Sequence, residues 1–77
     1  MIIVRTDDAI YAGGEAFYLE KLHYSDEWYV VFMNAGAVKI TKPAPLKKAK
    51  ETLEWITDRL IEQQLLQNIV IDMRKCE

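Results

Sequence analysis

The residues that offer nucleophilic or acid–base chemistry are few. His23 is the only histidine and Cys76 the only cysteine of the 77-residue chain. A Ser-His-Asp or Cys-His arrangement needs a nucleophile, a base and an orienting group within hydrogen-bonding distance. Ser25 and Asp26 follow His23, but their segment has the composition of a turn. Cys76 stands beside Lys75 in a polar tail, where a thiol without a neighbouring base is usually inert. We therefore expect no catalytic residues and no enzymatic activity.

Metal, cofactor and phosphate motifs are equally sparse. One histidine and one cysteine in different regions cannot supply a tetrahedral zinc site. Asp7, Asp8 and Glu15 lack the spacing of a calcium-binding loop. Gly13-Gly14 is followed by no Gly-Lys-Ser/Thr sequence and is typical of a turn or bulge. We predict no metal and no cofactor.

The composition predicts one small globular domain over residues 1–77, with a frayed tail from about residue 74. The chain is 51% hydrophobic and 29% charged, with a net charge of -2. A chain of this length buries only about 60% of its unfolded surface, so a dimer interface would add usefully to its stability. A single cysteine excludes an intramolecular disulfide. No basic and apolar leader follows Met1, and no apolar run approaches the roughly 20 residues of a membrane helix. We expect a soluble, cytoplasmic protein without a membrane partner.

Short β-branched and aromatic segments predict strands at residues 2–5, 16–24, 28–33 and 37–41. Residues 15–24 fit both a helical and a strand period, and their aromatic content favours a strand. Residues 28–33 are apolar on both faces, as in a central strand. Asn34-Ala35-Gly36 reads as a hairpin loop in which Gly36 takes a positive φ. Residues 16–41 therefore predict an antiparallel meander.

A long amphipathic helix is predicted from about Pro45 to Gln67. Its apolar positions repeat at intervals of three and four residues: Leu46, Ala49, Leu53, Ile56 and Leu60. Asn68 is the expected C-terminal cap, and residues 69–73 form a last strand. The predicted fold class is α+β, a mainly antiparallel sheet of four to five strands with the helix across one face, in the order β-β-β-β-α-β. Whether the last strand pairs with the first or lies at an edge is left open.

The net charge conceals a basic segment. Residues 39–50 contain five lysines and no acid, a local charge of +5 against -7 in the rest of the chain. Lysines in the first turns of a helix oppose the helix dipole, so we consider Lys42, Lys47, Lys48 and Lys50 candidate contacts for an anion or a nucleic acid. The alternative is a solvated face on which Lys47 and Lys50 pair with Glu51 and Glu54.

Aromatic residues suggest a second surface. Of the eight, seven lie in the first half of the chain, and a sheet covered by one helix leaves its other face to water or to a partner. Trp55 lies about 140° from the centre of the apolar helix stripe, which predicts a position outside the core, stacked on Arg59. Our candidate partner interface consists of Trp55, Arg59, Leu66, Tyr18 and Tyr29.

These observations favour a small non-enzymatic protein-binding domain, an adaptor, inhibitor or regulator of the kind common in phages and mobile elements. Its partner would be another protein or a second copy. Nucleic-acid binding through residues 39–50 is the alternative, opposed by Glu20, Asp26 and Glu27 on the aromatic strands and by a pI near 5.4. A ligand pocket between helix and sheet is a third hypothesis, and no motif supports it.

Overall fold

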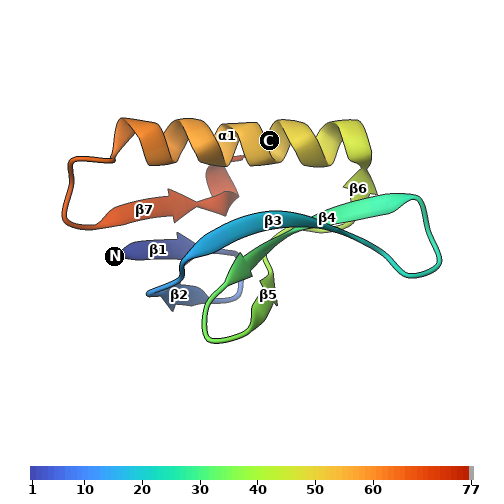
Figure 1. Ribbon diagram of the computed structural model, residues 1–77, viewed down its shortest axis with the longest axis horizontal. Helices are drawn as coiled ribbons and strands as arrows, with labels where there is room; N and C mark the ends of the chain where they lie inside the picture. Colours follow the sequence, from blue (N-terminus) through green and yellow to red (C-terminus); the bar gives the residue numbers. More distant parts are fainter. Residues whose placement is uncertain (77) are drawn as a thin grey trace.

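Seven short strands and one helix make up residues 1–76, the part of the chain that the computed structural model describes (Figure 1). The α+β class and the single helix before the last strand confirm the prediction. The elements are β1 (Ile2–Arg5), β2 (Ile10–Ala12), β3 (Ala16–Lys21), β4 (Glu27–Met33), β5 (Ala37–Lys39), β6 (Ala44–Pro45), α1 (Leu46–Glu62), β7 (Ile69–Asp72) and a 3-10 turn (Met73–Lys75). No helix in residues 1–76 is long and apolar enough to cross a membrane.

The strands divide into two sheets. The first sheet has the order β2-β1-β7, in which β1 pairs antiparallel with β2 and parallel with β7. The last strand therefore lies beside the first, and α1 makes the crossover that a parallel pair requires. The register places Val4 opposite Ile71, so both side chains point toward the helix-covered side.

The second sheet is the predicted antiparallel meander, β3-β4-β5, with the short β6 pairing to β4. Residues 16–21 form a strand, as their aromatic content indicates. At the β4–β5 turn Gly36 has φ 150°, and Ala35 also adopts a left-handed φ of 54°. The Asn34 amide closes this turn by donating to the Gly36 carbonyl at 2.9 Å.

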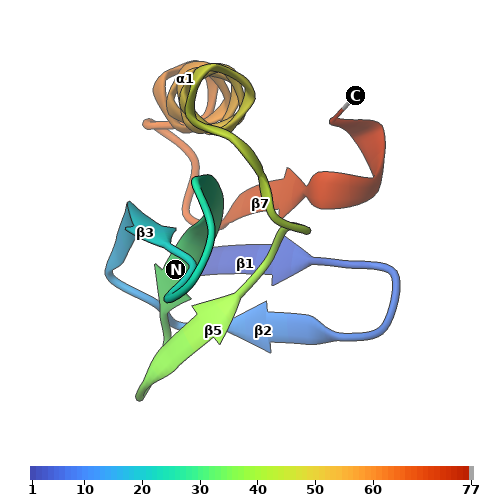
Figure 2. The same ribbon diagram turned by 90° about the vertical axis from the view of Figure 1, so that its right-hand side faces the viewer.

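The core lies where the helix meets both sheets. Its buried residues are Val4 and Ile71 from the first sheet, Val30 and Phe32 from β4, Ile40 after β5, and Ile56 of the helix. Figure 2 looks nearly along α1 and shows the helix above the two sheets. Phe17 stacks on Phe32 with 4.8 Å between ring centroids. The two sheets thus share one core beneath a single helix.

The helix begins where it was predicted to begin but ends earlier. It stops at Glu62, with Gln63 as C-cap, so the predicted continuation to Gln67 and the Asn68 cap are wrong. The apolar stripe ends at Leu60, and without it residues 63–68 gain nothing by remaining helical over the core. At the other end the helix begins at Leu46, directly after Pro45, as predicted. Leu46, which the prediction assigned to the apolar stripe, is exposed.

Candidate interaction surfaces

On the outer face of the second sheet, side chains of neighbouring strands cover one another. Tyr18, Val31 and Lys39 are cross-strand partners and share this face. Glu20 and Tyr29 form the adjacent pair. Val31 is fully buried there. Its neighbours' side chains therefore lie over it and reduce the aromatic surface left for a partner.

Tyr29 is buried among the side chains of this face. We predicted it at the partner interface, but it is only 6% exposed. Its hydroxyl donates to Glu20 Oε2 at 2.8 Å, and Lys39 Nζ lies 4.7 Å from the ring centroid. The bond to Glu20, together with burial, raises the pKa of Tyr29. Tyr18 remains partly exposed, and its hydroxyl donates to Met33 Sδ at 3.7 Å.

Trp55 is not outside the core, contrary to the prediction. It is half-buried and packs against the core cluster. Its indole reaches toward the C-terminal turn, where it lines a hollow with Lys75 and Cys76. A helical wheel gives the direction of Cβ but not the reach of so large a side chain.

The predicted stack of Arg59 on Trp55 is confirmed. The guanidinium carbon lies 5.2 Å from the ring centroid. The same guanidinium donates to Glu62 through Nε at 3.0 Å and Nη2 at 2.6 Å. This pair raises the pKa of Arg59 and lowers that of Glu62. Arg59 is therefore held on the helix surface by two neighbours.

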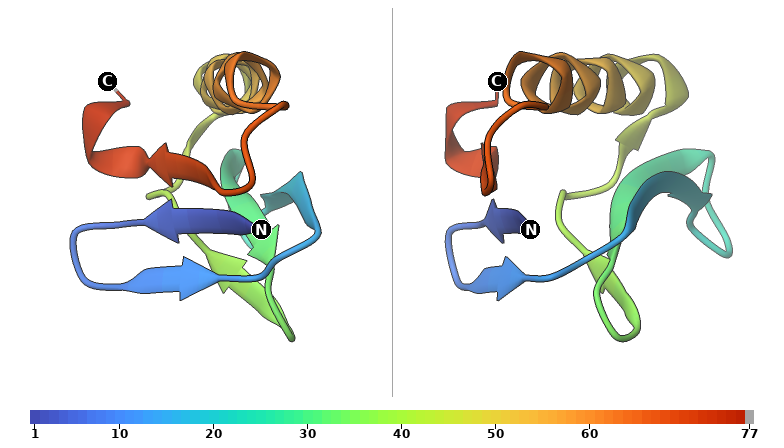
Figure 3. Two further views of the ribbon diagram at one scale, coloured as in Figure 1. Left: turned by 90° about the vertical axis from the view of Figure 1, so that its left-hand side faces the viewer. Right: turned by 60° about the vertical axis from the view of Figure 1, so that its left-hand side comes forward.

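Exposed aliphatic side chains gather at the end of the molecule where α1 turns into β7. We call this cluster the apolar end; it consists of Met1, Ile61, Leu65, Leu66 and Val70. Leu65 is 95% exposed and Leu66 59%. Figure 3 (left) faces this end, with the α1–β7 loop and the N-terminus together. Of the five, only Leu66 was predicted. The pairing of β1 with β7 brings Met1 and Val70 to this end, whereas Ile61 and Leu65 are close to Leu66 in the sequence and were not predicted.

Hydrogen bonds hold the apolar end in place. The Met1 ammonium donates to the Gln67 carbonyl at 2.9 Å, and the Ile69 amide donates to the Met1 carbonyl at 2.8 Å. Leu66 N donates to the Gln63 carbonyl at 2.9 Å. The Gln63 side chain in turn bonds the backbone of Val70. The loop is thus tied to the helix, to β7 and to the N-terminus.

The lysines of the basic segment divide between two places. Lys42 and Lys48 line a cavity, whereas Lys47 and Lys50 are exposed helix residues that do not line it. The predicted pairs of Lys47 with Glu51 and of Lys50 with Glu54 do not form. The ion pairs within residues 1–76 are Lys21–Asp26, Arg59–Glu62 and Asp72–Arg74. The structure therefore does not bring the four predicted lysines to one site.

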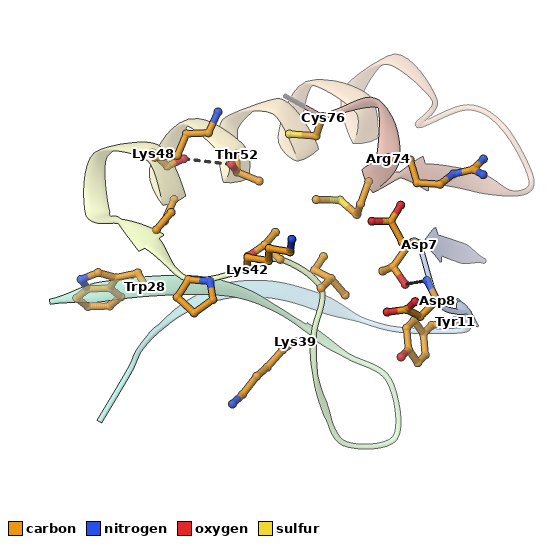
Figure 4. A pocket seen from close by; sticks show the side chains of 17 residues that line it. Asp7, Asp8, Tyr11, Trp28, Lys39, Lys42, Lys48, Thr52, Arg74 and Cys76 are labelled. Carbon is orange, nitrogen blue, oxygen red and sulfur yellow. Dashed lines mark hydrogen bonds between the residues drawn. The ribbon is translucent and has the colours of Figure 1, made fainter. Parts of the chain in front are cut away.

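The cavity has a volume of about 590 Å³ and lies among four parts of the chain. They are the turn after β1, the segment between β5 and β6, the first turns of α1 and the C-terminal turn (Figure 4). Ile40, Ala49 and Thr52 are buried residues of its lining. Lys42 enters it from one side and Asp7 and Asp8 from the other. The sequence analysis named Lys42 and Lys48, but it did not bring them together with Asp7 and Asp8, because these residues lie far apart in the chain.

The residues first considered for chemistry lie in separate surroundings. His23 is exposed and makes an edge contact with the Tyr24 ring, with 5.1 Å between centroids. Cys76 is half-buried beside Trp55 and Lys75. Within residues 1–76, no group of three or more His, Cys, Asp or Glu side chains is placed to hold a metal ion.

No protein-family model, curated protein or solved structure matches the chain. A function must therefore be argued from the surfaces themselves.

Proposed function

We propose that this chain is a small non-enzymatic protein-binding domain, an adaptor, inhibitor or regulator, that docks through its apolar end. The observation that carries the proposal is the exposure of Leu65 and Leu66, 95% and 59%, on a loop fixed by hydrogen bonds. Its single cysteine suits a reducing compartment, so we place its action in the cytoplasm.

Energetics favour this use of the apolar end. Burying a leucine side chain against a partner is worth about 1.5–3 kcal/mol. An unrestrained loop would lose part of that gain when it becomes ordered on binding. Here the Gln63, Met1 and Gln67 bonds already order the loop, so more of the gain remains for association. Adjacent exposed leucines on a fixed loop are typical of an interaction site.

Association through the apolar end is tested with one variant at that end and one variant far from it. Leu66→Glu places a charge in the proposed interface, whereas Tyr24→Glu changes a residue that is 95% exposed in the β3–β4 loop at the opposite end of the long axis (Figure 1). Sedimentation over a concentration series detects a second copy, and co-purification from the native cells detects another protein. We expect Leu66→Glu alone to abolish association. Equal behaviour of the two variants and the unmodified chain contradicts the proposal.

Nucleic-acid binding is less well supported. Lys42 and Lys48 share their cavity with Asp7 and Asp8, and those carboxylates repel phosphates. Lys47 and Lys50 do not line that cavity. Binding of labelled oligonucleotides at low salt, lost on replacing Lys42 and Lys48, would favour this function over protein binding.

A further inference from the structure

The cavity described above is built by turns that are themselves well fixed. Thr6 organises the turn after β1, since its Oγ1 accepts from the amides of Asp8 at 3.3 Å and Ala9 at 3.1 Å. The Thr6 amide donates to the Ala9 carbonyl at 2.9 Å. Asp7 lies between these bonded positions. Figure 4 shows the carboxylates of Asp7 and Asp8 pointing into the cavity.

The opposite wall is basic. Lys42 lies in the segment between β5 and β6, and its side chain points into the cavity (Figure 4). The preceding residue fixes this segment, because Thr41 Oγ1 accepts from the Val30 amide at 2.9 Å. Lys39, nearby in sequence, is directed to the Tyr29 ring instead. Lys42 is therefore the cation that this segment offers to the cavity.

These opposite charges face one another without pairing. Neither Asp7 nor Asp8 belongs to an ion pair within residues 1–76, and neither does Lys42. Arg74, which also lines the cavity, donates to Asp72 through Nε at 2.9 Å and Nη2 at 2.8 Å, and Asp7 interacts with it electrostatically without forming an ion pair. An occupant that bridges the cavity would thus meet Lys42 on one side, Asp7 and Asp8 on the other, and the half-buried apolar side chains of Tyr11 and Met73, which also line it.

We propose that this cavity binds an extended peptide segment of a protein partner. The segment presents an acidic side chain to Lys42, a basic side chain to Asp7 and Asp8, and an apolar side chain to the half-buried Tyr11 and Met73. Charge complementarity selects this occupant, because a purely anionic ligand would meet the two carboxylates and a purely cationic one would meet Lys42. The inference rests on the proposed protein-binding function and adds the chemistry of one partner segment.

Selection of a displayed random-peptide library on the full chain tests the inference. We expect the enriched peptides to carry one acidic and one basic residue at a constant spacing. Fluorescence anisotropy measures the affinity of the chain for a selected peptide. Lys42→Glu should lower this affinity by about tenfold or more. A peptide with its acid changed to lysine should recover binding to Lys42→Glu, which excludes misfolding as the cause. In the same way, a peptide whose basic residue is changed to an acidic one should recover binding to Asp7→Lys.

Two controls separate the two sites. Lys47→Glu makes the same charge change on an exposed helix residue outside the cavity lining and should leave peptide binding nearly unchanged. Leu66→Glu should also leave it unchanged while it abolishes docking through the apolar end. Enrichment of no peptide, equal effects of Lys42→Glu and Lys47→Glu, or loss of peptide binding in Leu66→Glu overturns the inference. The last result would leave the proposed function standing.

Discussion

The side-chain amide of Gln63 pairs with the backbone of Val70 as a neighbouring strand would. Gln63 Nε2 donates to the Val70 carbonyl, and Gln63 Oε1 accepts from the Val70 amide, both at 2.9 Å. Ile69 and Ile71 alternate with Val70 in the ladder with β1, so Val70 turns its polar groups to the outer edge of β7. The amide therefore satisfies part of an edge that would otherwise be open to another chain.

Gln63→Ala should lower the free energy of unfolding by about 1–2 kcal/mol, because it removes two hydrogen bonds that join the helix end to β7. Urea unfolding measures the change. Gln64→Ala is the matched control, since Gln64 is exposed and makes no side-chain bond to β7. If the two variants lose the same stability, the Gln63 side chain does not join these elements.

The two adjacent glycines should respond differently to alanine. A Cβ on Gly14 would overlap the Phe32 ring and lie 2.7 Å from the Met33 carbonyl oxygen. Gly13 has open space around it but a φ of +90°. We expect Gly14→Ala to cost at least about 3 kcal/mol from overpacking, and Gly13→Ala about 1–2 kcal/mol from backbone strain. Chemical unfolding of both variants checks the order, and a reversed order contradicts the packing of β4 against Gly14.

Acid should weaken the fold through Asp72. The hydrogen bond from the Arg74 side chain is the main cause that lowers the pKa of Asp72 from 3.8 to about 2. Because the folded pKa lies below the unfolded one, the ion pair stabilises the fold above about pH 4, and this contribution is lost as the pH falls toward 2. The stability difference between the unmodified chain and Asp72→Asn should shrink across that range in urea titrations. A difference that stays constant with pH contradicts this assignment.

Trp55→Ala should destabilise the chain by about 2 kcal/mol, because the half-buried indole packs against the core. Arg59→Lys keeps the charge but loses the planar stack and the two-point pairing with Glu62. It should cost less than Trp55→Ala, because Glu62 is exposed and surface ion pairs contribute little. Thermal unfolding of both variants provides the comparison. If Trp55→Ala is as stable as the unmodified chain, Trp55 does not pack against the core, and the exposed position that the helical wheel predicts is the right one.

Local sequence patterns predicted the parts of the fold that depend on neighbouring residues. The apolar run from Trp28 to Met33 predicted the central strand, and Pro45 marked the helix start. Gly36 supplied the turn between β4 and β5. These features follow from backbone preferences that act within a few residues.

Features made by distant residues could not be predicted in this way. Tyr29 is buried because the register brings Glu20 and Lys39 to its two sides. The cavity depends on Lys42 and Asp7, which the turns of both sheets bring to facing walls. The very short β2 and β6 carry too few residues for a periodic signal.

The central claim, docking through the apolar end, is tested most directly by photo-crosslinking in the native cells. A photoreactive residue is placed at Leu65 in one variant and at Tyr24 in another, since both side chains are 95% exposed. We predict a discrete crosslinked protein from position 65, reduced when Leu66→Glu is added, and none from position 24. The same products from both positions, or none from position 65, would contradict the proposed function.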